Sequence, residues 1–148
     1  MNGFRALAAL LVTASVTAGC AERASQAPSS VAGSPALTAD QISGTWTLVS
    51  IQPAGQAVQA APPGASYTVT FADGRLSTRA DCNVCNGAFT LSGQTLTAGP
   101  ALACTLAACP TMAFENGYTR LLGGESTVTL SNNVLALSSA RGVLRFMR

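Results

Sequence analysis

Cysteine is the residue type in this sequence whose number and spacing suggest the most chemistry. Four of the five cysteines, Cys82, Cys85, Cys104 and Cys109, lie close together, and Cys20 stands apart near the N-terminus. Thiols form disulfides in an oxidising compartment, hold zinc as thiolates, or exchange electrons when two residues separate a pair of them. The surroundings of each cysteine indicate which of these chemistries applies.

Two disulfides are the first interpretation of the four clustered cysteines, because the N-terminus is typical of an exported chain. Four cysteines allow three pairings. A hairpin is expected in which Leu91 lies opposite Leu96, and the nested pairs Cys85–Cys104 and Cys82–Cys109 continue its register better than the crossed pairs. Each bond would close a loop of about 20–28 residues and stabilise the fold by about 3–4 kcal/mol.

Zinc binding and redox exchange stay open as alternatives for the same four cysteines. Their spacing, C-x2-C followed later by C-x4-C, is near that of a zinc ribbon. Cys82-Asn83-Val84-Cys85 has the C-x-x-C spacing of redox proteins, but no helix is expected to begin there to stabilise a thiolate. Because disulfides are preferred, we expect no metal and no cofactor.

The first twenty residues resemble the export signal of a bacterial lipoprotein. Arg5 precedes an uncharged stretch, Ala6 to Val16, which is shorter than the roughly 20 apolar residues that span a bilayer. Thr17-Ala18-Gly19-Cys20 then resembles a lipobox, in which the signal peptide, residues 1–19, is removed and Cys20 receives lipid. Thr17 departs from the usual leucine, and an ordinary secretory signal is the alternative. Ala21, where aspartate would retain a lipoprotein at the inner membrane, favours the outer membrane.

Residues 20–43 are expected to form the lipidated cysteine and a flexible tether. Ala21 to Ser43 is rich in Ala, Ser, Pro and Gly, so it cannot bury enough surface to offset its ordering entropy. A flexible chain of this length reaches about 25 Å. The end of this segment, Leu37 to Ile42, is expected to dock on the domain or to form a short turn. The folded domain is expected over residues 44–148.

The sequence of the domain predicts strands joined by tight turns. Period-two alternation and β-branched residues indicate half-buried strands. Asp73-Gly74 and Asn132-Asn133 are typical of two-residue turns, because these residue types adopt or tolerate positive φ. The predicted strands are Gly44–Ile51, Tyr67–Ala72, Arg75–Arg79, Gly87–Leu91, Thr95–Gly99, Ser126–Ser131, Val134–Ser138 and Val143–Arg148.

One segment, Pro110 to Leu122, predicts a helix. Phe114, Tyr118 and Leu121 recur at helical spacing, the proline suits the first helical turn, and Gly123-Gly124 provides a stop. We therefore expect a mainly β fold, in which a small antiparallel barrel-like sheet with one α-helix at about residues 110–122 is braced by two disulfides.

The domain resembles the META domain, or HslJ-like, family of heat-shock proteins over roughly residues 44–148. The resemblance implies an envelope or secreted protein, often a lipoprotein, with a small β-barrel-like fold and one helix. It links the chain to heat shock, novobiocin resistance and virulence, and it implies no enzymatic activity and no catalytic residues. Cys85 and Cys104, present in only part of the family, imply a second bond. The motifs that support the resemblance are Gly44-Thr45-Trp46-Thr47-Leu48, Tyr67-Thr68-Val69-Thr70-Phe71, Asp73-Gly74-Arg75-Leu76, Asp81-Cys82-Asn83, Asn86-Gly87-Ala88-Phe89, Leu91-Ser92-Gly93 with Leu96, Thr105, Ala108-Cys109-Pro110 and Met112.

Composition excludes several classes of activity. Histidine and lysine are absent, which excludes Ser–His and Cys–His nucleophile pairs, imidazole metal sites and Schiff bases. Glu115 and Glu125 have no visible carboxylate partner, Asp81 is expected to cap a turn, and Asp73 belongs to its hairpin. The formal charge of +2 comes from scattered arginines, not from the basic stripe that nucleic acid requires. We expect neither an enzyme nor a nucleic-acid-binding protein.

For the remaining candidate residues, a structural role is preferred to a binding role. Trp46 is expected in the core, with a ligand-lining role as the alternative. Asn83 and Asn86 are expected to hydrogen-bond the backbone of the cysteine loop. Arg75 and Arg79 share a strand face and are expected to be a solvated surface pair, with contact to lipid phosphate or peptidoglycan carboxylates as the alternative.

These observations predict a lipid-anchored envelope protein, at the outer membrane in preference to the inner, that is monomeric and acts in envelope integrity or in stress and drug tolerance. It would bind a protein or an envelope component such as peptidoglycan. Two alternatives are open. One is a small apolar ligand inside or at the mouth of the barrel, which needs a pocket of roughly 300 Å³ or more. The other is inhibition of a hydrolase through an exposed loop, for which the Asn83–Ala103 region is the candidate.

Overall fold

The computed structural model describes residues 36–148. The predicted signal peptide, residues 1–19, the predicted lipidation site Cys20 and most of the predicted tether lie outside the described residues. The elements in chain order are α1 (Ala39–Ile42), β1 (Gly44–Pro53), β2 (Gln59–Ala60), β3 (Tyr67–Ala72), β4 (Arg75–Ala80), β5 (Asn83–Ser92), β6 (Thr95–Ala98), β7 (Ala103–Cys104), α2 (Met112–Leu122), β8 (Gly124–Ser131), β9 (Val134–Ser139) and β10 (Gly142–Met147).

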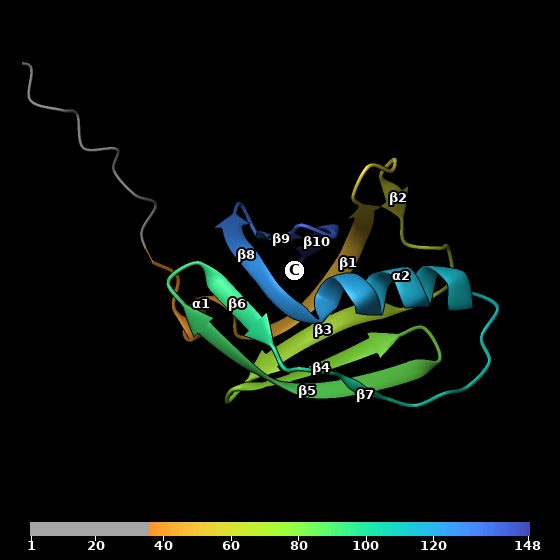
Figure 1. The fold of residues 1–148 in the computed structure, drawn as a ribbon, viewed down its shortest axis with the longest axis horizontal. Coiled ribbons are helices and arrows are strands. Elements are labelled where there is room, and N and C mark those ends of the chain that lie inside the picture. The colour runs from red at the N-terminus through yellow and green to blue at the C-terminus, as the bar shows by residue number, and fades with distance from the viewer. Residues whose placement is uncertain (1–35) are drawn as a thin grey trace, which may run out of the picture. The chain divides into compact units, whose positions relative to one another are not determined.

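The long strands close into an antiparallel β-barrel, as predicted (Figure 1). Each strand pairs with its neighbours in the order β1-β3-β4-β5-β6-β8-β9-β10, and β10 pairs back onto β1 from Thr47↔Met147 to Pro53↔Gly142. The two-residue strands β2 and β7 pair with the parts of β1 and β5 that β3 and β6 leave unpaired. Closure leaves no open edge among the eight barrel strands.

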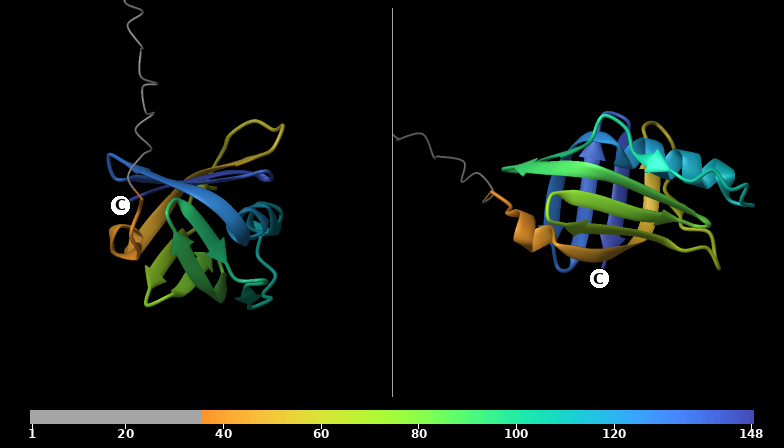
Figure 2. Two further views of the ribbon diagram at one scale, coloured as in Figure 1. Left: turned by 60° about the vertical axis from the view of Figure 1, so that its left-hand side comes forward. Right: turned by 90° about the horizontal axis from the view of Figure 1, so that it is seen from below.

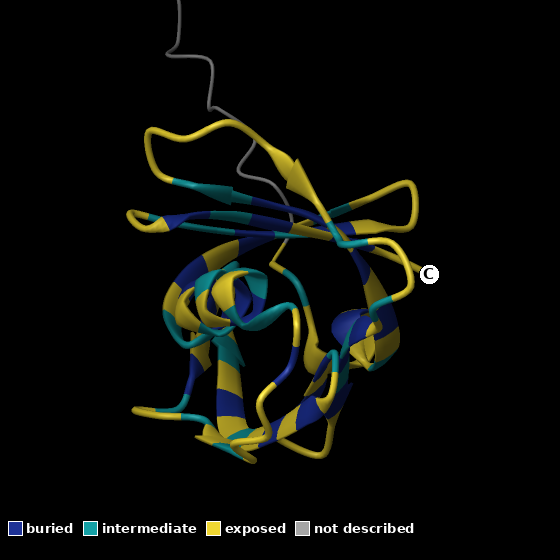
Figure 3. Cartoon of the chain, turned by 90° about the vertical axis from the view of Figure 1, so that its right-hand side faces the viewer, coloured by how far each residue is buried: buried dark blue, intermediate teal, exposed yellow. Residues whose placement is uncertain are grey.

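The barrel interior is packed with side chains. Buried and exposed residues alternate along the strands, which Figure 3 shows as dark blue and yellow bands. Trp46 is fully buried, as predicted, and its indole Nε1 donates a hydrogen bond to the backbone oxygen of Ile42 at 2.7 Å. The largest fully buried side chains include Trp46, Tyr67, Tyr118, Phe71, Phe146, Ile42, Ile51, Leu76, Leu96, Leu122, Leu135 and Leu137.

The two helices lie at opposite ends of the barrel (Figures 1 and 2). At one end Ile42 of α1 is fully buried, and the backbone nitrogen of Leu37 donates to the oxygen of Gly93 at 3.1 Å. The segment Leu37–Ile42 therefore docks on the barrel and also forms a short helical turn. At the other end α2 packs against β1, β4 and β10 and buries Tyr118, Leu121 and Leu122.

Helix α2 begins later than predicted. The helix runs from Met112, with Thr111 as the N-cap, instead of from Pro110. Cys109 is bonded to Cys82, and the Thr111 hydroxyl donates to the Asp81 carboxylate at 2.5 Å, so this stretch forms a turn before the helix. The helix ends at Leu122 as predicted. Within residues 36–148, neither helix combines the length and apolar character needed to cross a bilayer.

The predicted turns and one predicted register are confirmed. Asp73-Gly74 and Asn132-Asn133 all adopt positive φ, between 49° and 71° in the first turn and 50° and 61° in the second. Leu91 lies opposite Leu96. The predicted start of β5, Gly87, was wrong by four residues. Strands β2 and β7 were not predicted. Strand β5 begins at Asn83, where the buried side chains are an amide and a disulfide sulfur, so the apolar alternation that marks a strand is missing.

Candidate functional site

The nested disulfides predicted from the hairpin register are present. Cys82 bonds Cys109 and Cys85 bonds Cys104, with Cys85 and Cys104 directly opposed in the β5–β7 pairing. In this state no thiolate of the four is left to hold zinc, and the two cysteines of the C-x-x-C segment bond different partners instead of each other. Within residues 36–148, no group of three His, Cys, Asp or Glu side chains is arranged to hold a metal.

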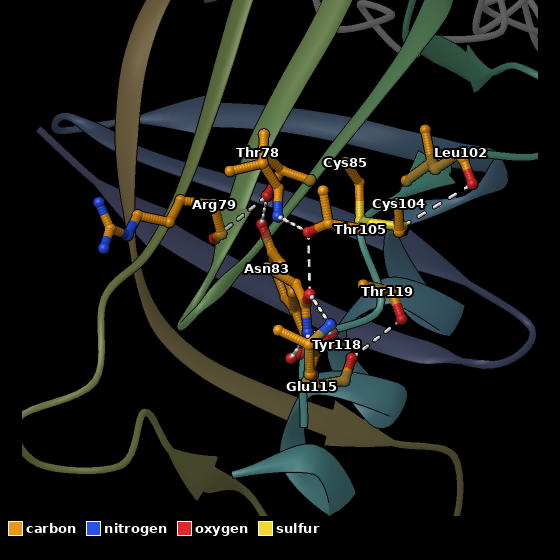
Figure 4. The surroundings of a disulfide bond; sticks show 12 residues. Thr78, Arg79, Asn83, Cys85, Leu102, Cys104, Thr105, Glu115, Tyr118 and Thr119 are labelled. Atoms are coloured by element: carbon orange, nitrogen blue, oxygen red, sulfur yellow. Dashed lines mark hydrogen bonds between the residues drawn. A yellow bond between two sulfur atoms is a disulfide. The ribbon is translucent and has the colours of Figure 1, made fainter. Parts of the chain in front are cut away.

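Asn83 organises the chain between the two disulfides (Figure 4). Its Oδ1 accepts hydrogen bonds from the Thr105 hydroxyl and the Ala107 backbone nitrogen, both at 2.8 Å. Its Nδ2 donates to the backbone oxygen of Ala107 at 3.0 Å. The prediction that Asn83 bonds the backbone of the cysteine loop is therefore confirmed. Asn86 is exposed and makes none of these contacts, so the same prediction was wrong for Asn86.

The acidic candidates are used to hold the fold. Glu115 is 5% exposed, and both of its carboxylate oxygens accept from Asn83 Nδ2, at 2.9 and 3.0 Å. Asp81 occupies the β4–β5 turn with a φ of 57° and accepts from Thr111, so it serves a turn as predicted. The role of Glu115 was not predicted, because its partner lies 32 residues away on another element.

A buried hydroxyl cluster joins α2 to the barrel wall. The hydroxyls of Tyr118 and Thr78 lie 2.6 Å apart, and Thr78 also donates to the backbone oxygen of Thr68 at 2.6 Å. Burial raises the pKa of Tyr118 well above its ordinary value, and the bond to Thr78 offsets part of that rise. Burial likewise raises the pKa of Tyr67, whose ring packs edge-on against Tyr118 at 5.4 Å. Both phenols are therefore neutral structural groups at physiological pH.

Arg75 and Arg79 are exposed on one face of β4, as predicted for a surface pair. Arg79 Nε donates to the backbone oxygen of Asp81 at 3.0 Å. At the α1 end, the Arg148 guanidinium lies 4.2 Å from the centre of the Trp46 ring and donates to the backbone oxygen of Ser43 at 2.9 Å. These contacts assign Arg79 and Arg148 structural roles.

Two hollows flank the outer side of α2. One, of about 470 Å³, lies between α2, the end of β1 and the segment that leads to β2. The other, of about 520 Å³, lies between α2 and residues 100–104. Asn116, Arg120 and Arg141 line both hollows. We call these three residues and the two hollows the α2 groove. Both volumes fall in the range of about 300–1,000 Å³ that is usual for ligand sites.

The α2 groove was not predicted from the sequence. Asn116 and Arg120 lie on α2, whereas Arg141 lies in the turn between β9 and β10. Two exposed arginines as far apart in the sequence as Arg120 and Arg141 form no recognisable motif. Only the closure of β10 onto β1 brings the β9–β10 turn to α2. The predicted helical stripe identified the buried face of α2 correctly but gave no signal for its outer face.

The exposed loop of the cysteine region also differs from the prediction. Most of Asn83–Ala103 is strand, so this region is not the exposed loop that was expected. The exposed stretch is Thr105–Ala108, in which Leu106 has 92% of its surface accessible. Asn83 and the disulfides on either side of this stretch hold its backbone.

Two of the sequence motifs are joined in the fold. The Asp81-Cys82-Asn83 run forms the β4–β5 turn, and the Cys109-Pro110 pair precedes α2. The bond Cys82–Cys109 and the contact between Asn83 and Glu115 join these two places.

Comparison with solved structures finds the same fold in two NMR structures. A solution NMR structure of a protein from Burkholderia xenovorans is 23% identical, with a TM-score of 0.62, and the match covers 83% of this chain and 95% of that one. A second NMR structure is 24% identical with a TM-score of 0.60, covering 75% and 94%. A crystal structure of an uncharacterized protein from Bacteroides eggerthii is 15% identical with a TM-score of 0.47, covering 72% and 99%.

No curated protein matches the chain. The model of the META domain family matches residues 37–148, which is most of the sequence and includes every element from α1 to β10. The chain therefore belongs to the META domain family.

Proposed function

We propose that this META-domain chain is a lipoprotein of the bacterial envelope, anchored through lipid on Cys20, and that it acts by binding a protein or envelope component. The lipobox-like residues before Cys20 support the anchor. The outer membrane is the proposed location, because Ala21 follows the cysteine. Envelope integrity or stress and drug tolerance is the proposed role, which the family resemblance implies.

The observation that best supports a binding function is the position of the α2 groove. The described chain starts beside α1, at one end of the barrel, and α2 lies at the other end (Figure 2). Helix α2 lines the groove, so the groove is remote from the start of the described chain. A lipid anchor on Cys20 that is joined to the α1 end would leave the α2 end free to contact a partner.

Binding is favoured over catalysis because the acidic and thiol groups nearest the cysteine loop hold the fold. The chain has no histidine and no lysine. Glu115 is bound by Asn83, Asp81 is bound by Thr111, and the four clustered cysteines are paired. A ligand inside the barrel is not proposed, because packed side chains fill the interior.

Inhibition of a hydrolase is a second candidate function, for which Leu106 is the specific observation. A leucine that is 92% exposed on a braced loop offers a preorganised apolar anchor for a cleft of a partner protein. Substitution Leu106→Asp would abolish such inhibition. It would leave binding at the α2 groove unchanged.

Fractionation and affinity capture test the proposed function. Wild-type chain should sediment with membranes, and the Cys20→Ser variant should be recovered in the soluble fraction. Envelope extract passed over chain that lacks residues 1–20 should yield a component absent from a column of the same chain after reduction and denaturation. Retention of Cys20→Ser in membranes would contradict the anchor. Equal recovery from both columns would contradict the binding function.

A strain that lacks the chain tests the proposed physiological role. It should be more sensitive to heat and to novobiocin than the parent strain. Wild-type chain should restore tolerance and Cys20→Ser should not, if anchoring is required. Unchanged tolerance in the deletion strain would contradict the stress role.

A further inference from the structure

We infer that the α2 groove binds an extended peptide segment that carries carboxylates, with Arg120 and Arg141 as the groups that hold the acidic side chains. This inference rests on the proposed function, because it names the ligand class of a domain that acts by binding.

Charge complementarity is the first argument for an acidic ligand. Arg120 and Arg141 line both hollows, and every titratable side chain among the described lining residues is one of these two arginines. Asp81 and Glu115 are hydrogen-bonded within the fold, and Asp40 and Asp73 line a third, smaller hollow. Glu125 follows Gly124 of the second hollow but is not one of the residues that line it. The groove therefore presents positive charge that no lining carboxylate neutralises.

One of the two arginines already contacts the backbone at the end of α2. The Arg141 guanidinium donates a hydrogen bond to the backbone oxygen of Gly123, the residue after α2. Arg120 extends from the last turn of α2 and lines the same two hollows. A guanidinium has donors arranged to bind a carboxylate through two bonds at once, and holding it before binding lowers the entropy cost.

The lining of the first hollow matches a peptide better than a small anion. Its accessible apolar part comes from Pro53, Ala54 and Ala113, against which a small hydrophobic side chain can pack. Gln56 and Gln59 add amides that can pair with a peptide backbone. Gln59 also belongs to β2, the last strand in the sheet order, whose outer edge has no strand partner within residues 36–148. An extended peptide can pair with such an edge.

Fluorescence anisotropy with two labelled peptide pools tests the inference on full-length chain purified in nonionic detergent. In both pools positions one, three and five are mixtures of Ala, Leu and Val. Positions two and four are Glu in the acidic pool and Gln in the matched pool. The acidic pool should bind about tenfold more tightly, because a hydrogen bond to a charged group is stronger than one to a neutral group. Excess inorganic phosphate shows whether a free anion alone occupies the groove.

Two variants and their matched controls locate the binding. Arg120→Gln removes a cation, and Asn116→Glu places a carboxylate between the hollows. Each substitution should lower the affinity for the acidic peptide pool about tenfold. Arg145→Gln removes an exposed cation on β10, and Thr129→Glu adds a carboxylate on β8, and neither residue lines the groove. Both controls should bind within about twofold of wild type, because distant surface charges are screened.

Several results would overturn the inference. Equal affinity for the two pools would show that carboxylates are not recognised, and equal losses in variants and controls would place binding outside the groove. If phosphate displaces both peptide pools completely and neither pool is preferred, the groove binds a free anion and not a peptide. If neither pool binds while envelope capture succeeds, the groove assignment falls and the binding function stands. If both experiments fail, both proposals fall.

Discussion

The side-chain nitrogen of Asn83 lies 2.9 and 3.0 Å from the two carboxylate oxygens of Glu115, at the point where the β4–β5 turn meets the first turn of α2. The same amide group bonds Ala107 in the loop between the disulfides. One side chain thus ties the barrel, the cysteine loop and the helix together. This junction holds the first turn of α2, the helix that lines the α2 groove.

Replacing Asn83 should destabilise the domain more than any other single polar substitution in this region. Asn83→Leu leaves the buried Glu115 carboxylate and the Ala107 amide without partners, so the free energy of unfolding should fall by about 2–4 kcal/mol. Urea denaturation measures the change. Asn86→Ala, at an exposed position of the same strand, is the control and should change it by less than about 0.5 kcal/mol. Equal effects of the two substitutions would contradict the role of Asn83.

Removing the outer disulfide should lower the melting temperature. The bond Cys82–Cys109 has a sequence separation of 27, so the double variant Cys82→Ser/Cys109→Ser should lose about 3–4 kcal/mol through the greater freedom of the unfolded chain. Calorimetry checks the loss, with exposed Ser92→Ala as the control. Thiol counting on denatured, unreduced protein should find none of the four clustered cysteines reactive. Four reactive thiols with bound zinc would contradict the disulfide assignment.

Stability should decline in alkaline solution because of the buried phenols. The unfolded chain releases the proton of Tyr118 near pH 10.0, whereas the folded chain retains it, since burial raises the pKa. The stabilisation is therefore complete below about pH 10 and is lost as the pH rises further. Tyr118→Phe should make this decline shallower, at a cost of about 1 kcal/mol at neutral pH from the lost bond to Thr78. An unchanged slope of stability against pH would contradict this account.

The seam where the barrel closes should not tolerate a side chain at Gly142. This residue has a φ of 141°, and an added Cβ would meet the backbone of Gln52 and lie 2.8 Å from the Cα of Pro53. Gly142→Ala should therefore cost at least about 2 kcal/mol in unfolding free energy. Gly93→Ala is the matched control, with a φ of 60° and open space around it, and should cost about 1 kcal/mol. Equal costs would show that the close approach is relieved in solution.

Local signals in the sequence were sufficient for much of the fold. Asp73-Gly74 predicted its turn because few residues adopt positive φ, and the pairing of Leu91 with Leu96 set a register from which the nested disulfides followed. The first part of β5 was missed because Asn83 and Cys85 occupy its inward positions. There, hydrogen bonds and a disulfide replace the apolar contacts that a sequence pattern records.

The candidate site was less accessible to prediction than the fold. Arg120 and Arg141 come from a helix and a distant turn, and only barrel closure brings them to one surface. The partner of Glu115 was likewise hidden, because Asn83 is remote in sequence. The anchoring of Cys20 remains a prediction from the sequence, because that residue lies outside the described range.

Site-specific photo-crosslinking in living cells tests the central claim that the α2 end of an anchored chain binds a partner. A photoreactive residue at Ala113, which lines the first hollow, should give an envelope adduct that the same probe at Thr129 on β8 does not give. Adding Arg120→Gln should reduce the adduct from position 113 without lowering the amount of folded chain. Equal adducts from both positions, or an adduct from position 113 that is undiminished in Arg120→Gln, would contradict the claim.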